Sequence, residues 1–217
     1  DMADFGITQG RINATYGYGE YYLGRGKGIL SLAANLEHNF GVGFDHYVVV
    51  QFSSLVRMID IIGGVDIVLE KPVDGRLQSM GYYSAGNHHL NGEAALDFMR
   101  IRYPDTDFQR IDRQSLVLQA LFRKARQELT YLQQSQMALV ALSDQAIKTS
   151  LAVKDLGPLI CLARIINEEQ IHLLQIPSDY YQANTTANGG SVQLPLPGSA
   201  DFIQAVMNGT TQEPEGN

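Results

Sequence analysis

Apolar residues recur along the chain with two spacings, and each spacing predicts a different element. Over residues 27–40 they return every three or four positions, which predicts a helix with one buried face. Residues 47–52 are nearly all apolar and β-branched, which predicts a strand covered on both faces. A helix over 53–62, with Ser53 as its N-cap, and a strand over 65–69 then complete a βαβ unit. We therefore expect the α/β class, as a three-layer α/β/α sandwich around a central mixed sheet.

The rest of the chain is predicted to be mainly helical. The expected elements are an irregular excursion over 71–87 with a small hairpin, helices over 92–99, 107–128, 132–147 and 156–166, a strand over 170–176, a loop over 182–198 and a helix over 201–208. Residues 209–217 are polar, which predicts a disordered tail. Because 217 residues suffice for one good core but not comfortably for two, we expect a single domain over residues 1–208.

Positive charge is concentrated in residues 100–114 of an otherwise acidic chain. The chain has 16 Lys and Arg against 23 Asp and Glu, and four of the arginines lie in this segment. Two of them precede Pro104, which interrupts regular structure, and the others follow on a new helix where the spacing i, i+3, i+6, i+7 places polar side chains on one face. The polar residues concerned are Arg100, Arg102, Asp107, Arg110, Arg113 and Gln114. We expect the four guanidinium groups to converge on one cleft, with the amide of Gln114 reaching the same cleft.

This combination of side chains favours a phosphate ligand. Guanidinium groups bind phosphate oxygens bidentately and keep their charge at any physiological pH, so the segment suits a pyrophosphate better than a carboxylate. Asp107, at the expected N-cap, could orient an arginine or cap the helix. The ordinary alternative is a solvated helix face with Asp–Arg pairs. The scarcity of cations elsewhere in the chain favours the anion-binding site.

Composition disfavours two other classes of protein. The net charge of −7 and a pI near 5.1 disfavour a nucleic-acid binder, which needs distributed Lys and Arg. A transcription regulator is also disfavoured, because the sequence has no helix-turn-helix pattern with a basic recognition helix. No apolar run approaches the length of a membrane span. The arginines therefore indicate one focused site rather than a basic surface.

Three stretches, in order, resemble the signature of the LytR-CpsA-Psr family of cell-wall glycopolymer ligases. They are residues 11–16 (RINATY), residues 44–52 continuing to 62–66, and residues 89–96 followed by the arginine segment. The resemblance covers roughly residues 1–180. Family members begin with a membrane anchor, a buried strand and two further motifs, none of which is complete here. The resemblance thus implies a domain that lacks its N-terminal strands and anchor.

The resemblance also implies a function and a set of site residues. It implies a phosphotransferase that attaches a polyprenyl-pyrophosphate-linked glycopolymer, of teichoic acid or capsule type, to peptidoglycan. The implied location is the extracytoplasmic, cell-wall side of the membrane. A pyrophosphatase side activity is a further possibility. The implied catalytic residues are Arg100, Arg102, Asp107, Arg110 and Arg113; the implied substrate-binding residues are Arg11 and Gln114. The implied cofactor is Mg²⁺ or Mn²⁺, with Asp1 as one ligand by its spacing and the other ligands upstream.

Several alternatives stay open at this point. The alternative function is that of a binder or regulator, which recognises a lipid-linked phosphate or glycan without transferring it. The particular glycopolymer, the oligomeric state and the activity of this fragment by itself are also open.

Overall fold

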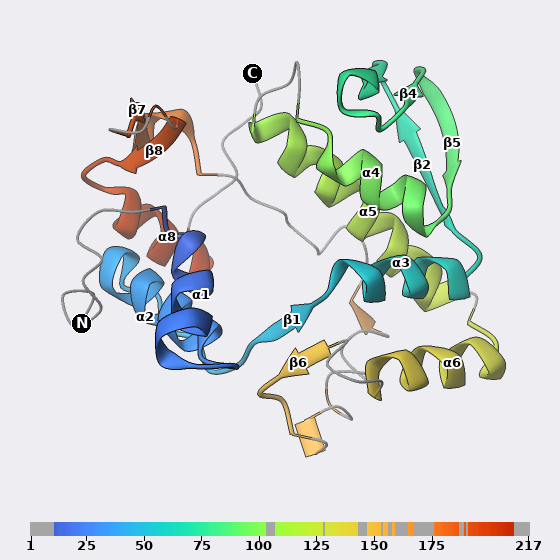
Figure 1. Cartoon of the computed structure of the whole chain (residues 1–217), viewed down its shortest axis with the longest axis horizontal. Coiled ribbons are helices and arrows are strands. Elements are labelled where there is room, and N and C mark those ends of the chain that lie inside the picture. The colour runs from blue at the N-terminus through green and yellow to red at the C-terminus, as the bar shows by residue number, and fades with distance from the viewer. Residues whose placement is uncertain are drawn as a thin grey trace. The chain divides into compact units, whose positions relative to one another are not determined.

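The computed structural model describes residues 11–102, 107–127, 129–142, 147–152, 154–155, 158, 165–166, 176–186, 189 and 191–210. The chain divides into two compact units (Figure 1). We call His46–Leu173 the arginine unit, and Asp1–Asp45 with Leu174–Asn217 the terminal unit. Each unit is described separately, and the single domain expected over residues 1–208 stays a prediction.

The terminal unit joins helices from one end of the chain to a hairpin and a helix from the other. Its elements are α1 (Ala14–Tyr18), a π-helical turn (Gly19–Leu23), α2 (Gly28–Phe40), a 3-10 turn (Ser178–Tyr180), β7 (Tyr181–Thr185), β8 (Ser191–Pro195) and α8 (Ser199–Met207). The amide of Gln204 on α8 donates to the carbonyls of Phe40 and Gly41 at 3.5 Å each, so α8 packs against the end of α2. Gly41 ends α2 with φ +65°, as its sequence position predicts.

The loop predicted over 182–198 is wrong, because most of that segment forms the β7–β8 hairpin. Tyr181 pairs with Pro195 and Thr185 pairs with Ser191. Pro195 is the last residue of β8, where a missing N–H interrupts no further pairing in the hairpin. The predicted loop therefore contains two paired strands, Tyr181–Thr185 and Ser191–Pro195.

The arginine unit alternates strands and helices along the chain. Its elements are β1 (Val48–Val50), α3 (Phe52–Ile61), β2 (Val65–Leu69), β3 (Val73–Asp74), a 3-10 turn (Arg76–Gln78), β4 (Tyr82–Tyr83), β5 (Gly86–Leu90), α4 (Gly92–Arg100), α5 (Asp107–Gln127), α6 (Tyr131–Leu142) and β6 (Ile147–Thr149). Among the described residues, the ladders are antiparallel and two-stranded: β1–β6, β2–β5 and β3–β4. The predicted order of strand, helix and strand over 48–69 is confirmed, as is the small hairpin in the excursion.

Three local predictions for this unit are wrong. Val48 and Val50 are exposed, so β1 is not covered on both faces; its described pairing is with β6 along one edge. Helix α3 begins at Phe52 with Gln51 as its N-cap, so Ser53 lies inside the first turn and does not cap it. The helix predicted over 132–147 ends at Leu142, because Ile147 already belongs to β6. Among the described residues, β1 pairs with β6 and β2 pairs with β5, so β1 and β2 are not hydrogen-bonded neighbours.

The core of the arginine unit lies between β2 and the helices that pack on it. Inward-facing residues alternate with exposed ones along β2, and α5 contacts this strand while α4 contacts both α3 and α5. The side chains without exposed surface include Ile59, Val65, Phe98, Ile101 and Val117. This core holds the end of α4 against α5, where the arginine segment lies. The helix predicted over 156–166 and the strand over 170–176 fall mostly outside the described residues, as do residues 211–217.

Candidate functional site

The candidate site lies at the C-terminal end of α4. The N-terminal end of this helix is fixed by several contacts. The side chain of Asn91 caps the helix by accepting from the N–H of Ala94 at 2.9 Å. The N–H of Gly92 donates to a carboxylate oxygen of Asp60 at 2.7 Å, which ties α4 to α3. A Cβ at Gly92 would lie 2.2 Å from the carbonyl oxygen of Val56, so only glycine allows this close approach. The helix that presents Arg100 is therefore held in place at its far end.

Two arginines flank a buried residue where the chain leaves α4. Ile101 has no exposed surface, whereas Arg100 and Arg102 on either side of it are exposed. The guanidinium of Arg100 lies 5.9 Å from the ring centroid of Phe52, the first residue of α3. The backbone N–H of Arg102 donates to Oε1 of Gln78 at 2.7 Å. Burial of the isoleucine thus anchors a short segment that displays two cations.

Arg113 occupies a different environment from these two. It is only 4 % exposed, and its Nη2 donates to the carbonyl of Ile101. Nε2 of Gln114 donates to the carbonyl of Met99 at 3.4 Å. The last carbonyls of a helix have no partner within the helix, and these two α5 side chains supply donors to the end of α4. Arg113 is therefore buried, unlike the exposed Arg100 and Arg102, and the expected convergence of the four guanidinium groups on one cleft stays a prediction.

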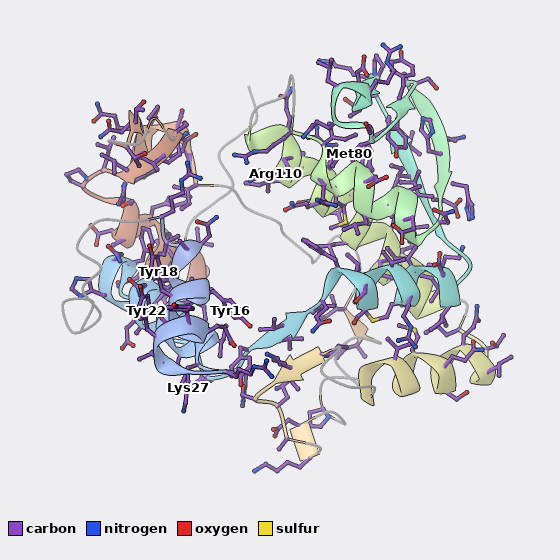
Figure 2. The ribbon with its side chains drawn as sticks, viewed as in Figure 1. Tyr16, Tyr18, Tyr22, Lys27, Met80 and Arg110 are labelled. Atoms are coloured by element: carbon purple, nitrogen blue, oxygen red, sulfur yellow. The ribbon has the colours of Figure 1, made fainter. Side chains whose placement is uncertain are left out.

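The remaining predicted site residues are placed only in part. Arg110 is half-buried near the start of α5, where Figure 2 labels it. Asp107 is the first residue of α5, and its side chain is outside the described part, as is Asp1 altogether. Arg11 is exposed in the terminal unit, just before α1. The structure therefore brings together the end of α4 with Arg113 and Gln114, and the roles assigned to all these residues stay predictions.

Gln78 is a residue of this site that sequence reasoning did not find. It belongs to the 3-10 turn Arg76–Gln78, which is held by Asp74: the carboxylate of Asp74 accepts from Nε and Nη2 of Arg76 at 2.9 and 2.6 Å. This guanidinium lowers the pKa of Asp74 from 3.8 to about 2. No local pattern indicates that the turn contacts Arg102, which is 24 residues further along the chain.

The described residues contain no ligand set for a metal ion. No group of three or more His, Cys, Asp or Glu side chains in this part of the chain could hold one. His89 pairs with Asp66, with Nδ1 and Oδ1 2.7 Å apart, but these two residues do not make a metal site by themselves. The ligands expected for Mg²⁺ or Mn²⁺ were Asp1 and residues upstream of this chain, which lie outside the described residues, so the metal stays a prediction. In the same part of the chain, no helix is both long enough and apolar enough to cross a membrane.

These features describe an α/β protein in which two exposed arginines lie on either side of a buried isoleucine at the end of α4. The LytR_cpsA_psr family matches residues 2–208, and the chain belongs to this family. The resemblance drawn from three short motifs is thereby confirmed. The match spans both compact units, so the family relationship is not confined to the arginine segment.

Two curated relatives and one solved structure illustrate the relationship. The regulatory protein MsrR of Staphylococcus aureus (strain COL) is 27% identical over 194 residues, which are 87% of this chain and 56% of MsrR. The polyisoprenyl-teichoic acid–peptidoglycan teichoic acid transferase TagU of Bacillus cereus is 32% identical over 116 residues, 52% of this chain and 34% of TagU. The chain thus spans about half of MsrR, and the match to TagU about a third of TagU. The crystal structure of B. subtilis TagV covers 94% of this chain and 77% of its own, with a TM-score of 0.70 at 23% identity, which confirms the α/β fold.

Proposed function

We propose that the protein containing this chain is a phosphotransferase that attaches a polyprenyl-pyrophosphate-linked glycopolymer to peptidoglycan outside the cytoplasm. The observation that carries the proposal is the pair of exposed arginines, Arg100 and Arg102, on either side of the fully buried Ile101. Membership of the family supports the class, and the activity in the name of TagU, a teichoic acid transferase, supports the substrate.

The chemistry that this site would perform is transfer of a phosphoryl-linked glycan to a hydroxyl. A hydroxyl of the cell wall attacks the phosphorus that bears the glycopolymer, and its proton passes to the solvent. The bond from that phosphorus to the bridging oxygen breaks, and polyprenyl phosphate leaves with the electron pair. Such a reaction needs in-line positioning and neutralisation of charge on the phosphates, and it needs no covalent protein nucleophile. Arg100 and Arg102 supply fixed positive charge, and no step of the proposal depends on a metal.

A second candidate function is a regulator that binds a lipid-linked phosphate or glycan without transferring it. The observation that favours it is the match to MsrR, which is named a regulatory protein and matches 87% of this chain. Both candidates require the arginine site to bind phosphate. They differ in whether a phosphorus–oxygen bond breaks.

The deciding experiment uses the full-length protein with a polyprenyl-pyrophosphate-linked glycan and a peptidoglycan acceptor. Release of polyprenyl phosphate is measured for the wild type, for Arg102→Ala and for Arg102→Lys. Removing one charged hydrogen bond that strengthens in the transition state costs about 2–4 kcal/mol, so we expect the alanine variant to turn over about 30- to 1,000-fold more slowly, with a smaller change in KM. Lysine keeps the charge but loses the planar fork, so it should restore only part of the rate.

Arg57→Ala is the matched control, because Arg57 is an exposed arginine on α3 of the same unit. Its rate should stay within about twofold of the wild type. A loss below about threefold for Arg102→Ala would exclude the catalytic role. Tight binding of the lipid-linked glycan by an inactive wild type would instead support the regulator.

A further inference from the structure

One peptide group in the site is held at both of its hydrogen-bonding ends by side chains from other elements. It is the peptide between Ile101 and Arg102: its N–H donates to Oε1 of Gln78 at 2.7 Å, and its carbonyl accepts from Nη2 of Arg113. Gln78 comes from the 3-10 turn before β4, and Arg113 comes from α5. This peptide cannot rotate about the chain axis without breaking both hydrogen bonds.

Buried side chains contact this peptide, whereas the side chain that follows it is exposed. Ile101 has no exposed surface, and Arg113 is 4 % exposed. Gly75 packs closely on the same isoleucine: a Cβ there would lie 2.7 Å from its Cδ1. The side chain of Arg102, in contrast, is exposed. The buried contacts therefore set the direction in which an exposed cation leaves the main chain.

We propose that Gln78 is a positioning residue that aims Arg102 at the phosphate by holding the Arg102 amide, without touching the substrate itself. The inference rests on the proposed function. A charged group contributes fully to a reaction only when its neighbours hold it within about 0.5 Å of the productive position. The turn that carries Gln78 is itself fixed by the bidentate pair of Asp74 and Arg76. The excursion between β2 and β5 thus gains a role in the site.

The test measures turnover of the lipid-linked glycan by the full-length protein carrying Gln78→Met. Methionine has nearly the same length but no amide oxygen, so it removes the hydrogen bond to the Arg102 N–H. We expect kcat to fall about 3- to 10-fold with KM within twofold of the wild type. The conservative variant Gln78→Glu keeps an acceptor for the Arg102 amide. Leu77→Ser is the matched control, because Leu77 is a 76 % exposed neighbour in the same turn, and it should leave kcat within twofold.

A double-mutant cycle separates positioning from a general structural effect. If Gln78 acts through Arg102, then Gln78→Met should cost nothing further in a protein that already carries Arg102→Ala. An equal loss of kcat in both backgrounds would overturn the proposal. So would an unchanged kcat in the single variant.

Hydrogen exchange of the Arg102 amide tests the contact without any activity. Gln78→Met should accelerate that exchange severalfold, whereas Gln78→Glu and Leu77→Ser should leave it close to the wild type. If the wild type transfers no glycan, the proposed function fails by itself, and this exchange still shows whether Gln78 holds the amide. Unchanged exchange in Gln78→Met would overturn the proposal that Gln78 holds the Arg102 amide, whatever the activity.

Discussion

Replacing Arg113 by methionine should lower the stability of the arginine unit, because this guanidinium serves the fold. Arg113 is 4 % exposed, and its Nη2 donates to the carbonyl of Ile101, a residue with no exposed surface. Methionine fills a similar length but has no donor, so the carbonyl loses this partner in a buried place. Leaving a buried acceptor without its partner costs about 1–3 kcal/mol. We therefore expect the free energy of unfolding to fall by about 2 kcal/mol.

Urea denaturation and thermal unfolding, both followed by circular dichroism, measure this change. A loss of about 2 kcal/mol corresponds to a decrease in Tm of about 4–8 °C for a chain of this size. Arg57→Met, at an exposed position on α3, is the control and should stay within about 0.5 kcal/mol of the wild type. If Arg113→Met unfolded like the wild type while turnover collapsed, the reasoning would be refuted. Arg113 would then act on the substrate, as its place in the sequence motif first indicated.

Two further predictions concern the core and the turn that carries Gln78. Ile59→Ala should lower the free energy of unfolding by about 2–5 kcal/mol in urea, because Ile59 has no exposed surface, and a loss below 1 kcal/mol would argue against this core. The carboxyl of Asp74 should titrate near pH 2 in an NMR experiment, because the guanidinium of Arg76 lowers its pKa from 3.8 to about 2. Since the folded-state pKa is the lower one, its contribution to stability is complete above about pH 4 and is lost as the pH falls through 2. Arg76→Ala should return the midpoint toward 3.8, and a wild-type midpoint already near that value would contradict the contact.

The local elements of this protein could be predicted from its sequence wherever a periodic pattern and a stop signal agree. Helix α2 and its end at Gly41, α4 before the arginines, and strand β2 all follow from apolar spacing and glycine positions. The arginine segment also stands out by charge alone, because cations are scarce elsewhere in the chain. Three short motifs in order were enough to indicate the family. These features depend on residues that are close together in the sequence, so they can be predicted without the tertiary structure.

The roles of individual side chains depended on contacts between segments that are distant in the sequence. Helical spacing placed Arg113 on the same face as Arg110, but packing of α5 against the end of α4 buries it beneath the carbonyl of Ile101. The contact between Gln78 and the Arg102 amide spans 24 residues and follows no local pattern. A periodic pattern specifies which residues share a face of an element, whereas the neighbouring element decides whether that face meets water, ligand or main chain. For this reason the folded structure separates the exposed arginines from the buried arginine that supports them.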